Sequence, residues 1–127
     1  MSYDVMVFDP GAAPRERADF MTWYHDQTQW AEPHGYNDPS VTSPGLRAWY
    51  DAMTIEYPNM NGPGEGGRDF DNPKLTDYSI GQSVIYAAFA WSQAEGAYHL
   101  VRALAAKHGV GFFDASADEG EIWVPGG

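Results

Sequence analysis

The pattern of apolar and polar positions divides the start of the chain into one strand and one helix. Residues 3–8 read YDVMVF and are apolar on both faces, which is typical of a strand in the middle of a sheet. A break at 9–11 follows, and the segment 14–30 then has one apolar side with a polar interruption at Gln27. The apolar positions of this predicted helix are Phe20, Trp23, Tyr24 and Trp30.

A second helix is predicted to begin at Ser43, because Pro44 follows it and proline is common in the first turn. Pro58 marks its end. The loop sequence EPHGYNDPSVTSPG, rich in proline and glycine, separates it from the first helix. Its apolar stripe is uninterrupted, at spacings i, i+3, i+4, i+7 and i+11: Leu46, Trp49, Tyr50, Met53 and Tyr57.

The second half of the chain predicts a hairpin, a third helix and two further strands. The sequence TDYSIGQSVIYAAFAW reads as two strands joined by a type II′ turn at Gly81 and Gln82. Ser92 and Glu95 have the spacing of a capping box, and the helix that they open is predicted to end at Gly109. VGFFDAS is then a strand, and EIWV a short strand at an edge of the sheet.

This order of elements predicts an α+β fold within a single domain, 1–127. If the two early helices form one crossover, the order is βα(α)ββαβ, a ferredoxin-like two-layer sandwich with a mainly antiparallel sheet and helices on one face. The two-helix insert spans 14–58 and a long loop spans 59–75. Other two-layer α+β arrangements are the alternatives.

Charge narrows the classes of partner. The chain has 18 acidic and 7 basic residues and a net charge of −11. Nucleic acids and anionic membrane surfaces are recognised largely through lysine and arginine, so this balance argues against both as partners. A basic protein, a cation or a neutral small molecule suits the charge better.

The N-terminal sequence and the absence of cysteine bear on the compartment. Without cysteine there is no disulfide, thiol nucleophile or cysteine-ligated zinc site. Residues 1–10 contain Asp4 and Asp9 and lack the basic and apolar regions of a signal peptide. The longest apolar run, VIYAAFAW, is far too short to span a membrane. We therefore expect a soluble, cytoplasmic protein.

Candidate catalytic and metal-binding residues do not form a known motif. His25, Glu32 and His34 have the side-chain chemistry of zinc ligands, but their spacing matches no metal motif. The preferred interpretation is an exposed His25 and a loop His34, with no metal and no cofactor. The acidic sequence DASADEGE lacks the glycine and the glutamate that an EF-hand needs at fixed positions, and reads as a solvated hairpin. No G-x-S-x-G elbow is present, and we assign no catalytic residue.

Aromatic residues are more numerous in the two-helix insert than a small core requires. Most of them are expected to be core residues, and the remainder would face a pocket or a partner, since tyrosine and tryptophan are enriched at interfaces. The candidate binding surface comprises Trp23, His25, Trp30, Glu32, His34, Tyr36 and Trp49.

Three stretches, YDVMVFDP, DYSIGQSVIYAAFAWSQAE and KHGVGFFD, resemble a group of small acidic bacterial proteins of uncharacterised function. The resemblance covers most of the chain. It implies a soluble bacterial protein and gives no catalytic residue to carry over. Small acidic proteins of this general class include immunity proteins that neutralise secreted toxins.

We therefore expect a non-catalytic protein-binding module, of the kind represented by an immunity-type inhibitor of a basic toxin. A second hypothesis is a small-molecule or metal-binding enzyme whose site lies between the sheet and the two-helix insert, around His25, Glu32 and His34. A third is a homodimer that pairs through an exposed sheet face, with Tyr78, Ile80, Tyr86 and Ala88 at the contact.

Overall fold

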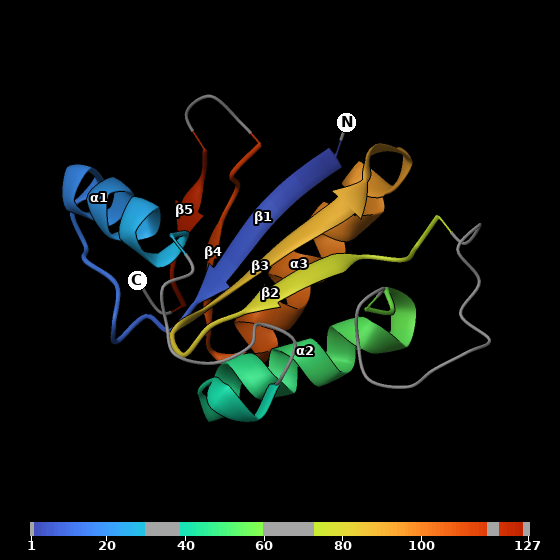
Figure 1. Ribbon diagram of the computed structural model, residues 1–127, viewed down its shortest axis with the longest axis horizontal. Coiled ribbons are helices and arrows are strands. Elements are labelled where there is room, and N and C mark those ends of the chain that lie inside the picture. The colour runs from blue at the N-terminus through green and yellow to red at the C-terminus, as the bar shows by residue number, and fades with distance from the viewer. Residues whose placement is uncertain (1, 30–38, 60–72, 117–119, 126–127) are drawn as a thin grey trace.

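The computed structural model describes residues 2–29, 39–59, 73–116 and 120–125. In these ranges the chain forms a five-stranded antiparallel sheet and three α-helices (Figure 1). This confirms the predicted α+β class. In chain order the elements are β1 (Ser2–Phe8), α1 (Arg17–Gln27), α2 (Pro44–Glu56), β2 (Asp77–Ile80), β3 (Val84–Ala90), α3 (Ala94–His108), β4 (Gly111–Phe113) and β5 (Ile122–Trp123).

The strands lie in the order β2-β3-β1-β4-β5, so the first strand of the chain occupies the centre of the sheet. β1 pairs along its whole length with β3, from Ser2 opposite Ala90 to Phe8 opposite Val84. On its other side β1 pairs with β4 only through its last three residues. The prediction from YDVMVF is confirmed, because Val5, Met6, Val7 and Phe8 are all fully buried.

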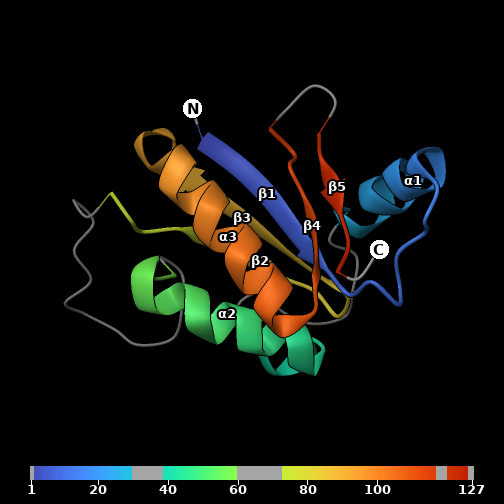
Figure 2. The same ribbon diagram turned by 180° about the vertical axis from the view of Figure 1, so that it is seen from behind.

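The larger core lies between one face of the sheet and helices α2 and α3, which lie side by side on that face (Figure 2). The whole predicted stripe of α2 is buried there. The stripe packs against alternate residues of β1, β2 and β3, whose side chains point to this face of the sheet: Val5, Val7, Tyr78, Ile80, Ile85, Ala87 and Phe89. Ser43 is the N-cap of α2, and Gly109 ends α3 in the left-handed region with φ 72°, both as predicted.

A smaller cluster covers part of the opposite face, where α1 packs through Phe20 on Met6, Phe8 and Phe113. The prediction that all helices lie on one face is therefore wrong. β1 is apolar on both sides, so each of its faces attracts a helix, and α1 and α2 go to opposite faces instead of forming one crossover layer (Figures 1 and 2).

Three further details differ from the predictions. The ferredoxin-like topology is not confirmed, because the strand order includes a fifth strand beyond β4. The capping box is absent: a 3-10 turn, Trp91–Gln93, precedes α3, whose N-cap is Gln93 and has no side-chain cap. The hairpin connection spans 81–83, and Gly81 does not have the positive φ of a type II′ turn, since Gly109 is the one positive-φ glycine in the described residues.

Within the described residues, no helix is long and apolar enough to cross a membrane. The predicted loop 59–75 falls mostly outside the described residues. Its first residue, Asn59, forms a parallel bridge with Thr76, which lies just beyond its last residue, and both residues are buried.

Candidate functional site

Among the described residues, the α1 side of the sheet is covered at one end only. Phe20 and the aromatic rings around it pack over Met6, Phe8 and Val84. The other end of the same face bears polar or small side chains, and it faces the viewer in Figure 1. Asp77 there is exposed, and the other side chains are half-buried: Asp4, Ser79, Tyr86 and Ala88.

The strand register places two carboxylates in one row across three strands. Ala88 of β3 pairs with Asp4 of β1 on one side and with Asp77 of β2 on the other. Side chains at directly opposed positions project to the same face, so both carboxylates stand on the open face with a methyl group between them. Two strand spacings separate the two Cα atoms by about 10 Å. The row is therefore an acidic strip across the open face, with the small side chain of Ala88 at its centre.

Two tyrosines border this row, and their hydroxyl groups are protonated at neutral pH. The Tyr86 hydroxyl donates to Asp4 Oδ2 at 2.7 Å, and the hydroxyl groups of Tyr86 and Tyr24 are in hydrogen-bonding contact. Burial raises the pKa of the Tyr86 hydroxyl well above its ordinary value, and the hydrogen bond to Asp4 raises it further. Burial also raises the pKa of Tyr24. At neutral pH these tyrosines are hydrogen-bond donors with aromatic faces, and they do not act as bases.

These groups line a groove of about 400 Å³ between the C-terminal part of α1 and the strands β2 and β3. Its walls are Tyr24, Thr28, Asp77, Ser79, Tyr86 and Ala88, with Asp4 joined to it through the Tyr86 hydroxyl. No lysine or arginine belongs to the described residues of this lining. Carboxylates, hydroxyls and aromatic rings together are suited to an organic cation.

The number of carboxylates favours an organic cation over a metal ion. A calcium ion takes six to eight oxygen ligands and a structural zinc ion takes four ligands, which Asp4 and Asp77 alone do not supply. The described residues contain no cluster of three or more His, Asp or Glu side chains that would hold a metal. A lysine or arginine side chain, in contrast, is long enough to contact both walls.

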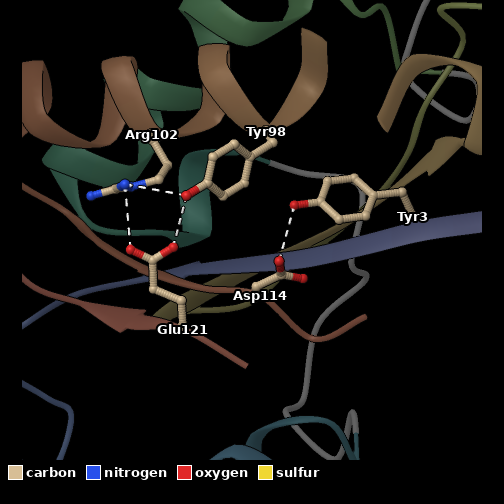
Figure 3. Close-up of polar contacts among 5 residues, drawn as sticks. All are labelled: Tyr3, Tyr98, Arg102, Asp114 and Glu121. Carbon is tan, nitrogen blue, oxygen red and sulfur yellow. Dashed lines mark hydrogen bonds and ion pairs between the residues drawn. The ribbon is translucent and has the colours of Figure 1, made fainter. Parts of the chain in front are cut away.

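A second polar cluster joins α3 to the strands on the other side of the molecule (Figure 3). The Tyr98 hydroxyl donates to Glu121 Oε1 at 2.8 Å, and Arg102 Nη1 lies 3.3 Å from Glu121 Oε2. Beside this pair, the Tyr3 hydroxyl donates to Asp114 Oδ2 at 3.4 Å. Burial raises the pKa of Tyr3 far above neutrality, and the charge of Asp114 adds to the effect.

This second cluster fastens β5 to the helix layer. The Arg102 guanidinium lies 5.3 Å from the Trp123 ring and 5.9 Å from the rings of Phe112 and Tyr98. The guanidinium therefore bridges an aromatic cage and the carboxylate of Glu121. Since β5 has only two residues, such contacts give the edge strand the stability that its short ladder lacks. We interpret the cluster as structural.

The structure describes three of the seven predicted binding residues, and it places Trp49 on the opposite face of the sheet from Trp23 and His25. Trp23 is half-buried on α1 and packs against Phe8 and Phe20, at centroid distances of 6.0 and 5.6 Å. His25 is exposed and its ring lies 5.4 Å from that of Tyr24. Trp49 is on the other side of the sheet, fully buried. Trp30, Glu32, His34 and Tyr36 lie outside the described residues.

None of the groove residues belongs to the binding surface predicted from the sequence, although two of them were expected at a homodimer contact. Of the set expected at a homodimer contact, Tyr86 and Ala88 lie on the open face, whereas Tyr78 and Ile80 are buried beneath the helices. The one sequence signal for the groove is Asp4, a carboxylate inside an otherwise apolar central strand. Comparison with protein-family models, curated proteins and solved structures finds no match.

Proposed function

We propose that the chain is a non-catalytic protein-binding module that recognises a basic partner, as an immunity-type inhibitor of a basic toxin does. The observation that carries this proposal is the row of Asp4, Ala88 and Asp77 on the open face of the sheet, of which Ala88 and Asp77 line the groove. A lysine or arginine side chain of the partner would lie over Ala88, between the two carboxylates. The aromatic rings of Tyr24 and Tyr86 would contact its charged group.

Charge over the whole molecule supports the same partner. The net charge of −11 speeds encounter with a basic surface, and this long-range attraction weakens as salt is added. It also opposes a homodimer through the groove, because Asp4 and Asp77 of the two copies would face each other. The second hypothesis, a small-molecule site between the sheet and the insert, would use this same groove for a small organic cation.

The elements that carry the groove also support a more specific description of the fold. If β5 and α1 are set aside, β2, β3, β1 and β4 lie in the order of a ferredoxin-like sheet, with α2 and α3 on one face. We propose that these elements are a ferredoxin-like core. The open face is then the side that the two helices of such a core leave uncovered.

Affinity capture with charge-matched variants tests the function. The immobilised chain is exposed to a host extract at low salt, and bound proteins are eluted with salt and identified by mass spectrometry. We expect a basic protein whose capture falls at least tenfold in the double variant Asp4→Asn with Asp77→Asn. The control is Asp51→Asn with Glu95→Gln, which removes the same charge from exposed positions on α2 and α3.

Two results would refute the proposal. One is equal capture by the groove variant and the control, which would show that charge alone attracts the partner. The other is capture of acidic or neutral proteins that salt does not release. Retention of a small cationic metabolite in place of a protein would support the small-molecule hypothesis instead. Circular dichroism of each variant checks that the fold is intact.

A further inference from the structure

A second cavity, of about 500 Å³, lies where the segment between β1 and α1 passes the end of β5. Figure 1 shows these two segments side by side at one end of the molecule. The cavity is on the same side of the sheet as the acidic groove, and no described residue lines both. Its apolar lining includes Phe8, Ala13, Ile122 and Val124.

Two guanidinium groups, those of Arg15 and Arg17, border this apolar lining. Arg17 Nη1 donates to the backbone oxygen of Gly120 at 2.9 Å, which uses one of the five N–H donors of the side chain. Arg15 is exposed and has no ion pair with any described residue. Both side chains therefore retain donors for a ligand.

This placement is unusual in a chain with 18 acidic residues and 7 basic ones. Two of the other described cations are already paired, Lys74 with Glu56 and Arg102 with Glu121. Arg15 and Arg17 are two positions apart and border the same cavity. The segment 9–19 also contains acidic residues, but none of them belongs to the described lining, so the charge on the described walls of the cavity is positive, which points to an anionic ligand at this position.

We propose that this cavity binds a small carboxylate with an apolar body, such as a medium-chain aliphatic acid. A guanidinium binds a carboxylate through two parallel hydrogen bonds, and the apolar part of the ligand would cover Ala13, Ile122 and Val124, which are partly exposed. The volume of about 500 Å³ lies within the range of roughly 300–1,000 Å³ that is typical of small-molecule sites. The net negative charge opposes a polyphosphate, whose several charges two arginines would not balance.

Titration with octanoate tests the site, with octanol as the uncharged ligand of the same length. In ¹H–¹⁵N spectra of the full chain, octanoate is expected to shift the amide signals of Phe8, Ala13, Ile122 and Val124 in a saturable way. Arg15→Gln is expected to weaken octanoate binding about tenfold, because a charge-assisted bidentate contact is lost, and to leave octanol binding unchanged. Arg15→Lys keeps the charge without the fork and should give an intermediate affinity.

Lys107→Gln, at an exposed position on α3, is the charge-matched control and should bind octanoate as the unchanged protein does. Because Arg15 contacts no charged partner in the described residues, its replacement should not affect folding, which circular dichroism checks. Equal affinity for octanol and octanoate would overturn the proposal, as would equal loss in Arg15→Gln and Lys107→Gln. Shifts at Leu100 and Leu104, which line a separate apolar groove, would also overturn it.

Discussion

Replacement of Trp49 by phenylalanine distinguishes a core role for this tryptophan from a binding role. Its side chain is fully buried, and Nε1 donates to the backbone oxygen of Val101 at 3.3 Å. Loss of that hydrogen bond costs about 1 kcal/mol. The smaller ring leaves a cavity, and since Trp→Ala in a core costs about 3–5 kcal/mol, the Trp→Phe cavity adds about 1–2 kcal/mol. We therefore expect the free energy of unfolding to fall by about 2–3 kcal/mol.

Urea unfolding followed by far-ultraviolet circular dichroism measures this loss, and Tm should fall by about 10 °C. The matched control is Trp91→Phe, the same substitution at a side chain that is 54% exposed and packs edge-on against Tyr3. It should cost about 0.5 kcal/mol. Equal losses in the two variants would refute the reasoning from burial. A folded Trp49→Phe variant that no longer captures the partner would show that Trp49 acts in binding.

The remaining predictions concern other buried contacts. Arg102→Gln removes the guanidinium from its aromatic cage and should lower the free energy of unfolding by about 1–2 kcal/mol, whereas Lys107→Gln on the same helix should change it little. Gly111→Ala would place a Cβ atom 2.3 Å from the fully buried Phe8 ring, so we expect Tm to fall by several degrees; an unchanged Tm would contradict this. Burial raises the pKa of Tyr78 above its unfolded value of 10.0, so above pH 10 the unfolded chain loses this proton more readily than the folded one. The contribution of Tyr78 to the free energy of unfolding is therefore complete below pH 10 and is lost as pH rises further. Urea unfolding between about pH 9 and 12 should show this loss, up to about 1.4 kcal/mol per pH unit, and Tyr78→Phe should show a shallower dependence.

Local patterns predicted the parts of the fold that depend on neighbouring residues. The stripe of α2 from Leu46 to Tyr57 has helical spacing and is buried throughout. Gly109 ends α3 because it adopts φ 72° without a steric penalty. The central position of β1 followed from its two apolar faces. Each of these features is fixed within one element of the chain.

Features that depend on contacts between distant segments were not predicted from the sequence, for physical reasons. The two apolar faces of β1 permit a helix on either side, so the sequence did not show which face α1 covers. The acidic row needs the register of three strands, which brings Asp4 and Asp77 together across 73 positions of sequence. The local spacing of Ser92 and Glu95 also gave a wrong prediction for the start of α3, because a 3-10 turn, Trp91–Gln93, stands where the capping box was predicted.

The most direct test of the account is to locate a bound cationic side chain on the protein. Acetyl-Gly-Arg-Gly-amide, titrated into the ¹⁵N-labelled chain at low salt, should shift the amide signals of Asp4, Asp77, Ser79, Tyr86 and Ala88 together. The shifts should disappear in the Asp4→Asn, Asp77→Asn variant and persist in the Asp51→Asn, Glu95→Gln control. Shifts spread over the exposed acidic residues of α2 and α3, or unchanged by the groove substitutions, would contradict a cation site on the open face of the sheet.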